Sequence, residues 1–242
     1  MRFFVGLHQP SDAKHVDAAF ISVNRIRNRK SQFVVGDWIM DSGAFTELEK
    51  YGAYREPPEV YAAQIKRWST NGNLLAAVSQ DYMCEAFMLE KTGLTIGDHQ
   101  RLTIERYDAI IACDTGCVPI IPVLQGYAPD DYVNHIRQYG DRLKFGMWVG
   151  VGSVCKRNGD PSAIEDVLLK IKRERPDLRL HGFGIKTTAL RSGVVRDCLH
   201  TADSMAWSYA ARMEGRDANS VFEAIAFSAR IDTMPVQFGF VF

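Results

Sequence analysis

Short apolar runs alternate with longer amphipathic segments along most of this chain. The runs show no regular alternation of polar residues, which is typical of strands that are buried on both faces of a parallel sheet. They predict strands at positions 3–7, 19–23, 38–40, 74–78, 118–124, 145–151, 180–185 and 201–206. Eight runs of this kind, most of them separated by helical segments, indicate an α/β protein.

Prolines mark the starts of three predicted helices, at Pro58, Pro129 and Pro161. Proline fits the first turn of a helix because the backbone N–H that it lacks would have no partner there. Asp160 caps the third helix. The apolar positions of that helix follow the i, i+3, i+4, i+7 spacing of one buried face: Ile164, Val167, Leu168 and Ile171.

This order of strands and helices predicts a single domain over residues 1–242, folded as a (β/α)₈ TIM-type barrel. Little sequence separates the first two strands, so we expect the barrel to be compact and irregular. A doubly wound sheet is the alternative, although no GxGxxG motif follows the first strand. A chain of 242 residues is long enough to bury the core of one barrel.

Composition argues against several classes of protein. Lys plus Arg and Asp plus Glu both total 29, so no net charge points to a nucleic-acid or membrane partner. No apolar run approaches membrane-spanning length and no signal peptide precedes the first strand, which predicts a soluble cytoplasmic protein. The five cysteines lack CxxC spacing, so we expect reduced thiols, no metal site and no cofactor.

Three aspartates each follow an apolar run: Asp41, Asp81 and Asp203. The carboxyl ends of parallel strands are where barrel enzymes place their chemistry. An amide and three glycines follow other runs in the same way: Gln125, Gly126, Gly150 and Gly152. We therefore expect carboxyl groups, an amide and exposed backbone groups to lie together at one rim of the barrel. Such an arrangement is typical of an active site. For each aspartate the simpler alternative is that it caps the helix after it.

Two groups of basic residues are candidates for binding the phosphates of a nucleic acid. The first, the basic segment, holds four cations within six residues: Arg25, Arg27, Arg29 and Lys30. The second, Lys156 and Arg157, lies beside the glycine loop, residues 150–152. A solvated basic surface is the alternative for both groups, and residue types alone do not separate DNA from RNA.

Four short motifs resemble, in the same order, those of tRNA-guanine transglycosylases: DSGAF at 41–45, PVLQG at 122–126, VGVG at 149–152 and ADS at 202–204. Longer stretches at 41–48, 151–159 and 203–208 look more like one branch, the DpdA family, which inserts 7-deazaguanines into DNA. The similarity runs from residue 6 to the region of residue 212. Ordered motifs of this kind are far more specific than any one of them.

The resemblance implies a base exchange in which guanine in DNA is replaced by a free 7-deazaguanine, such as 7-cyano-7-deazaguanine. It implies that Asp203 is the covalent nucleophile, that Asp41 takes part in proton transfer, and that Asp81 reads the Watson–Crick edge of guanine. It assigns further base contacts to four residues: Gln125, Gly126, Gly150 and Gly152. A carboxylate nucleophile suits two successive displacements at one anomeric carbon. Clustered acids also push each other's titration apart, which leaves one protonated at neutral pH.

Three departures from the tRNA enzymes bear on the substrate. Ala44 stands where a glycine is common, the C-terminal zinc-binding cysteines and histidines are missing, and the chain is short for the additions that grip tRNA. The last two favour DNA over tRNA. Two alternatives stay open: a tRNA-guanine transglycosylase with the same chemistry, and a barrel that binds a nucleobase or nucleic acid without catalysis.

Overall fold

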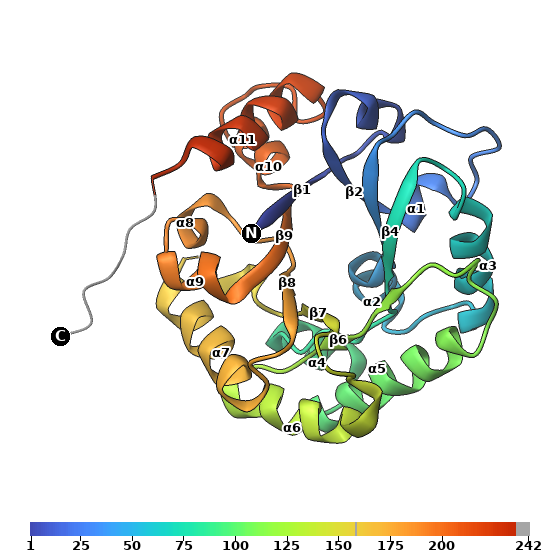
Figure 1. The fold of residues 1–242 in the computed structure, drawn as a ribbon, viewed down its shortest axis with the longest axis vertical. Helices are drawn as coiled ribbons and strands as arrows, with labels where there is room; N and C mark the ends of the chain where they lie inside the picture. The colour runs from blue at the N-terminus through green and yellow to red at the C-terminus, as the bar shows by residue number, and fades with distance from the viewer. Residues whose placement is uncertain (158, 236–242) are drawn as a thin grey trace.

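The strands form one parallel sheet that curves into a nearly closed barrel, with helices around its outside (Figure 1). This architecture is seen in a computed structural model of the chain, which describes residues 1–157 and 159–235. It confirms the predicted TIM-type barrel, and the doubly wound sheet is set aside.

Nine strands make up the sheet, in the order β5-β4-β3-β2-β1-β9-β8-β7-β6. Their bounds are β1 (Arg2–Gly6), β2 (Ala18–Ser22), β3 (Asp37–Asp41), β4 (Asn73–Val78), β5 (Ile120–Ile121), β6 (Val123–Leu124), β7 (Trp148–Val151), β8 (Arg179–Gly182) and β9 (Leu199–Ser204). Most predicted strands agree with these bounds to within a few residues. The strand predicted at 145–151 begins only at Trp148, because Gly146 has a φ of 68° and turns the chain.

One predicted strand, at 118–124, is observed as two short strands because Pro122 interrupts it. Proline has no N–H to give to a neighbouring strand, although its carbonyl still accepts one bond. The carbonyl of Ile121 accepts from the Ser79 N–H at 2.9 Å, and the carbonyl of Pro122 accepts from the Gly150 N–H at 2.8 Å. Residues 118–124 therefore bond to the segment after β4 through the Ile121 carbonyl and to β7 through the Pro122 carbonyl. These bonds connect the two ends of the sheet.

Helices fill most connections between the strands. They are α1 (Val23–Ile26), α2 (Ala44–Tyr51), α3 (Pro58–Trp68), α4 (Ala86–Thr92), α5 (Ile96–Ile111), α6 (Pro129–Tyr139), α7 (Pro161–Glu174), α8 (Thr187–Leu190), α9 (Gly193–Cys198), α10 (Ala206–Met213) and α11 (Val221–Thr233), with 3₁₀ turns η1 (Pro10–His15), η2 (Gly140–Arg142) and η3 (Cys155–Arg157). The three helices predicted from their prolines are confirmed as α3, α6 and α7. Only η1 separates β1 from β2, which is the expected irregularity. Within 1–157 and 159–235, no helix is long and apolar enough to cross a bilayer.

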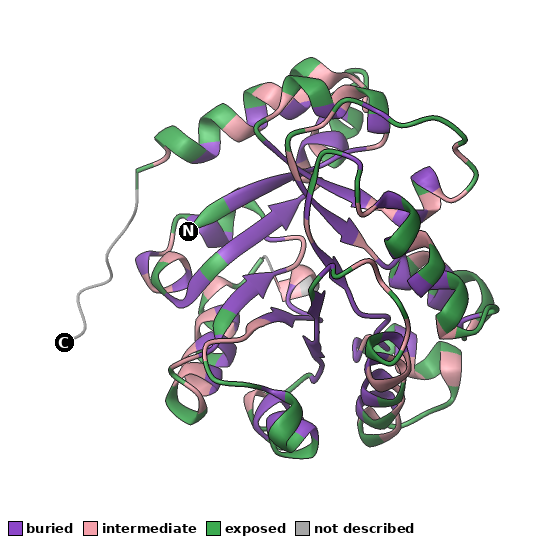
Figure 2. Cartoon of the chain, turned by 45° about the vertical axis from the view of Figure 1, so that its right-hand side comes forward, coloured by how far each residue is buried: buried purple, intermediate pink, exposed green. Residues whose placement is uncertain are grey.

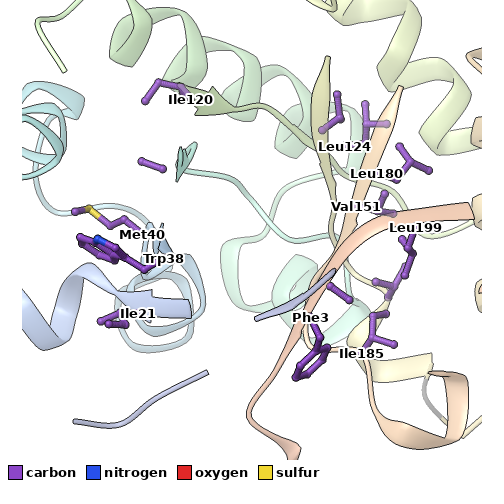
Figure 3. Close-up of a cluster of buried hydrophobic side chains, with 14 of the residues drawn as sticks. Phe3, Ile21, Trp38, Met40, Ile120, Leu124, Val151, Leu180, Ile185 and Leu199 are labelled. Atoms are coloured by element: carbon purple, nitrogen blue, oxygen red, sulfur yellow. The ribbon is translucent and has the colours of Figure 1, made fainter. Parts of the chain in front are cut away.

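Side chains along each strand alternate between the barrel interior and the layer under the helices. The interior is filled by one cluster of buried residues: Phe4, Ala18, Phe20, Ile39, Ala76, Val78, Ile121 and Val123. Their strand neighbours, such as Phe3, Ile21 and Trp38, belong to the larger cluster that packs against the helices (Figure 3). The strands are almost wholly buried, and the helices expose mainly their outer faces (Figure 2). Burial on both faces explains why the strands appear in the sequence as continuous apolar runs.

Candidate active site

The carboxyl ends of the parallel strands surround a cavity of about 690 Å³, called here the upper cavity. Six of the residues predicted from the sequence line it: Arg25, Asp41, Asp81, Gln125, Gly152 and Asp203. Each comes from the end of a different strand or from the segment that follows it. The fold thus brings together side chains that are far apart in the chain, as the rim of a barrel enzyme does.

Asp41 is the last residue of β3, and its carboxyl group is held by the backbone that follows. Gly43 has a φ of 75°, a conformation that favours glycine, and its N–H donates to Asp41 Oδ2 at 3.1 Å. Burial is the main influence on Asp41 and raises its pKa to about 6, and the charge of Asp203 adds to the rise. A hydrogen bond from the Ser22 side chain opposes it. The carboxyl group therefore titrates near neutral pH, as a group that gives and takes a proton should.

Asp81 and Gln125 form a hydrogen-bonded pair in the upper cavity. Nε2 of Gln125 donates to Oδ2 of Asp81. Burial raises the pKa of Asp81 to about 7; the Gln125 hydrogen bond opposes this rise, and the negative charges of Asp41 and Glu85 add to it. The Tyr54 hydroxyl fixes the backbone here, since it accepts from the Asp81 N–H and donates to the Asp81 carbonyl, both at 3.0 Å. Asp81 is thus a fixed acid whose charge changes close to neutral pH.

Two further polar residues of the upper cavity, Ser153 and Glu85, were missed by the sequence analysis. Ser153 Oγ lies 2.8 Å from Gln125 Oε1 and 3.1 Å from Glu85 Oε2. It also accepts from the Cys84 N–H at 2.9 Å. The single hydroxyl hydrogen can serve one of the two oxygens at a time. Ser153 follows Gly152 directly in a motif already noted, so position was the available signal, whereas Glu85 carries no sequence signal that separates it from a surface acid.

Asp203 is 5% exposed and is held at one oxygen by two donors. Its Oδ1 accepts from the Gly184 N–H at 3.2 Å and lies 3.2 Å from Nε2 of His181. Both donors belong to β8 or to the loop after it. His181 was also missed, although a histidine inside an apolar strand, at a position that faces the barrel interior, is a usable signal.

The three predicted glycines lie where other groups approach closely. A Cβ on Gly152 would lie 2.5 Å from Cδ of Gln125, so this glycine leaves room for the amide in the cavity. A Cβ on Gly150 would lie 2.5 Å from the ring of Phe183, and one on Gly126 would lie 2.6 Å from Cβ of Asp131. Among the described residues, Gly126 and Gly150 are not part of the cavity lining. They pack the framework beside it, and their direct contact with the base stays a prediction.

The basic segment is only partly directed at the upper cavity. Arg25 lines it. Arg27 forms an ion pair with Glu56 at 3.5 Å, and Arg29 donates to a backbone carbonyl at 2.9 Å. Lys30 is exposed in the loop before β3. The four cations therefore do not form one patch around the cavity, and Arg25 is the member placed to meet a ligand there.

The second basic group lies beside η3. Arg157 donates to the Tyr127 carbonyl, and its guanidinium lies 4.5 Å from the centre of the Tyr127 ring. Tyr127 is 52% exposed, so this pair presents an aromatic face and a cation to solvent. The side chain of Lys156 lies outside the described residues.

Metal ligation was not expected from the cysteine spacing. In the described part of the chain, no group of three or more His, Cys, Asp or Glu side chains is arranged to hold a metal ion. The five cysteines are free thiols. That the protein works without a metal stays a prediction, which a chelator tests.

The three aspartates of the upper cavity differ in their surroundings, which is how one site separates an acid from a nucleophile. Asp41 and Asp81 have a pKa raised toward neutrality, whereas Asp203 is held by hydrogen-bond donors. Displacement at an anomeric carbon with retention needs a carboxylate nucleophile and a separate proton donor. The arrangement therefore suits glycosyl transfer through two displacements.

Comparison with curated proteins finds no match for this chain. The family model of DpdA, described as DeoxyPurine in DNA protein A, matches residues 1–233. The match covers every strand of the barrel, every helix through α11 and all the predicted site residues. It confirms the resemblance seen in the ordered motifs. The chain belongs to the DpdA family, the DNA-acting branch of the tRNA-guanine transglycosylase superfamily.

Proposed function

We propose that this chain is a base-exchange transglycosylase that replaces guanine in DNA with a 7-deazaguanine through a covalent aspartyl–sugar intermediate. The convergence of Asp41, Asp81 and Asp203 on one cavity carries the proposal. Base exchange with retention needs a nucleophile, a proton donor and a base-reading acceptor in one place. Membership of the DpdA family supports DNA as the substrate.

In the first half-reaction, the carboxylate of Asp203 attacks C1′ of the target deoxyribose. A C–O bond forms to Asp203 while the C–N bond to guanine breaks, and guanine leaves with the electron pair of that bond. Asp41 gives its proton to the departing base. Because burial raises the pKa of Asp41 to about 6, a usable share of this group is protonated near neutral pH.

In the second half-reaction, the 7-deazaguanine attacks C1′ from the same pocket. Its ring N–H gives a proton to the Asp41 carboxylate, the new C–N bond forms, and the C–O bond to Asp203 breaks. Asp203 leaves as a carboxylate and Asp41 is protonated again, so the enzyme returns to its starting state. Two displacements at one carbon leave the sugar configuration unchanged.

We assign recognition of the base to Asp81 and Gln125. The edge of guanine offers N–H donors and one carbonyl acceptor, and 7-deazaguanine shares that edge. Asp81 supplies an acceptor, while the amide of Gln125 both donates and accepts. The pKa of Asp81 at about 7 lets the empty cavity hold this group neutral, and the N–H donors of the base then favour its charged form.

The target guanine has to leave the base stack to reach the cavity, which costs a few kcal/mol and less in a single strand. Arg25 in the cavity lining, and Lys156 and Arg157 beside the glycine loop, are the cations we assign to the phosphates that flank the extruded nucleotide. The second substrate is a free 7-deazaguanine base such as 7-cyano-7-deazaguanine.

The test is incorporation of labelled guanine into duplex DNA, single-stranded DNA and tRNA in parallel, with 7-cyano-7-deazaguanine as a competing base. We expect label in DNA, loss of label on competition, and a denaturation-resistant protein–DNA adduct. Asp203→Asn should abolish all three without unfolding the protein, since the change is nearly isosteric. The matched control is Asp130→Asn, an exposed aspartate of α6.

Each alternative has its own signature in this experiment. Label in tRNA alone would overturn the DNA assignment. Base binding without label in any arm would indicate a non-catalytic barrel. An adduct that persists in Asp203→Asn would remove Asp203 as the nucleophile.

A further inference from the structure

His181 lies beside Asp203 in the barrel interior, and no step of the proposed exchange uses it. Its side chain is wholly buried. Its Nε2 lies 3.2 Å from Asp203 Oδ1, and its Nδ1 lies 2.8 Å from Thr201 Oγ1. The ring stacks on Phe20 with centroids 5.5 Å apart and an interplanar angle of 16°, and the Phe183 ring meets it edge-on at 4.7 Å. The imidazole is therefore fixed in position by its two ring nitrogens and by both rings.

The direction of the hydrogen bonds follows from the groups at the two ends. A carboxylate only accepts, so Nε2 of His181 carries the ring hydrogen and donates to Asp203 Oδ1. Nδ1 of the neutral imidazole then accepts from the hydroxyl of Thr201. The Thr201 oxygen accepts in turn from Nε1 of Trp148 at 2.8 Å, since an indole N–H can only donate. Each group in this chain donates to the next, from the indole to the aspartate.

Both hydrogen bonds to the Asp203 carboxylate fall on the same oxygen. Among the described residues, Gly184 and His181 supply them, and each is directed at Oδ1. We propose that His181, fixed by Thr201 and Trp148, is a positioning residue that holds Oδ1 of Asp203 so that Oδ2 attacks the sugar. This inference rests on the proposed function, because it takes Asp203 to be the nucleophile.

The same two donors serve both half-reactions. When Oδ2 bonds to C1′, Oδ1 becomes the carbonyl oxygen of the aspartyl ester, and a carbonyl still accepts two hydrogen bonds. When the C–Oδ2 bond breaks, its electron pair returns to the carboxylate, and the donors at Oδ1 stabilise the returning negative charge. His181 neither gains nor loses a proton in this account.

Thr201 is the best position to test, because it is not among the residues that line the upper cavity. Thr201→Val keeps the side-chain shape and removes the hydroxyl. Nδ1 of His181 then loses its hydrogen-bond donor, so the imidazole is no longer held at both ring nitrogens and its Nε2–H can move away from Asp203 Oδ1. A lost hydrogen bond to a charged group predicts that the adduct forms about 10- to 100-fold more slowly. Thr201→Ser keeps the hydroxyl and should restore the rate to within about threefold of the parent.

The readout is the single-turnover rate of adduct formation, with binding of free 7-cyano-7-deazaguanine measured alongside. Base binding should stay unchanged in both variants, since Asp81 and Gln125 are untouched. A slower rate of adduct formation with unchanged base binding separates the positioning of Asp203 from general damage to the cavity.

A Thr201→Val rate equal to that of the parent overturns the inference alone. So does a loss that Thr201→Ser does not repair, because that pattern marks a packing defect. A parent enzyme that forms no adduct through Asp203 overturns the proposed function, and the inference with it.

Discussion

Replacing Gly152 with alanine should disable base recognition while leaving Asp203 in place. The added methyl group would lie 2.5 Å from Cδ and 2.8 Å from Oε1 of Gln125, and closer still to Nε2. Contacts under 3.0 Å are not tolerated, so the amide of Gln125 has to move out of its position. The φ of Gly152 lies outside the left-handed region, so alanine causes no backbone strain there. The effect of the substitution is therefore on the position of the Gln125 amide.

The size of the effect follows from the bonds that the amide gives up. It donates to Asp81, and its oxygen lies 2.8 Å from the Ser153 hydroxyl. A hydrogen bond to a charged group contributes about 1.5–3 kcal/mol, which corresponds to roughly 10- to 150-fold in affinity for the base. Because the Gln125 bond opposes the effect of burial on Asp81, its loss should also raise the pKa of Asp81 further.

Calorimetric binding of free 7-cyano-7-deazaguanine measures this loss, and thermal unfolding checks that the protein stays folded. The matched control is Gly97→Ala in α5, where a new methyl group would lie 3.8 Å from Thr95 Oγ1, an ordinary van der Waals contact. If Gly152→Ala binds the base as tightly as the parent, the amide of Gln125 does not belong to the base site.

Three further predictions concern stability, DNA binding and metal. Burial raises the pKa of Asp81 from 3.8 to about 7, so the folded state binds more protons than the unfolded state and loses stability as the pH rises between these values. Asp81→Asn should remove this loss, which amounts to about 4 kcal/mol at pH 8. Urea unfolding at pH 4.5 and 8 measures it, and no gain in stability for the variant at pH 8 would contradict the prediction. Arg25 lines the cavity, so Arg25→Ala should lower the slope of log affinity for DNA against log salt concentration by roughly 0.7 to 0.9. The Arg29 side chain bonds to its own loop, so Arg29→Ala should leave this slope unchanged. Equal slopes for the two variants would contradict the separate roles of the two arginines. In the proposed exchange, carboxyl groups supply both the nucleophile and the proton, so the reaction should survive a chelator. One equivalent of zinc in the pure protein would refute this.

The pattern of apolar runs was sufficient to predict the barrel, because strands buried on both faces must be apolar throughout. The strand-end rule also placed Asp41, Asp81 and Asp203 at one rim, and the cavity collects all three. The break at Pro122 was visible in the sequence, but its consequence depends on which strands lie on either side.

Other parts of the site could not be predicted, because they depend on contacts between strands that the sequence does not pair. His181 gains its place from the register that sets it opposite Thr201. Glu85 becomes a cavity residue only because the chain after Asp81 folds back over Ser153. The four cations of the basic segment are close together in the sequence. In the structure, a four-residue helix and a loop direct their side chains to different partners.

Because β1 pairs with β9, the candidate active site is assembled only when folding is complete. Arg2 is aligned with Thr201 and Phe4 with Asp203, so the earliest strand neighbours the last one, and Phe227 of α11 then packs on Phe3. Contacts between such distant parts of a chain form late, because a long loop has to close first. Asp203 thus meets Asp41 only when the barrel closes. A partly synthesised or partly unfolded chain therefore has no assembled site, and under the proposed function it cannot open glycosidic bonds in DNA until its fold is finished.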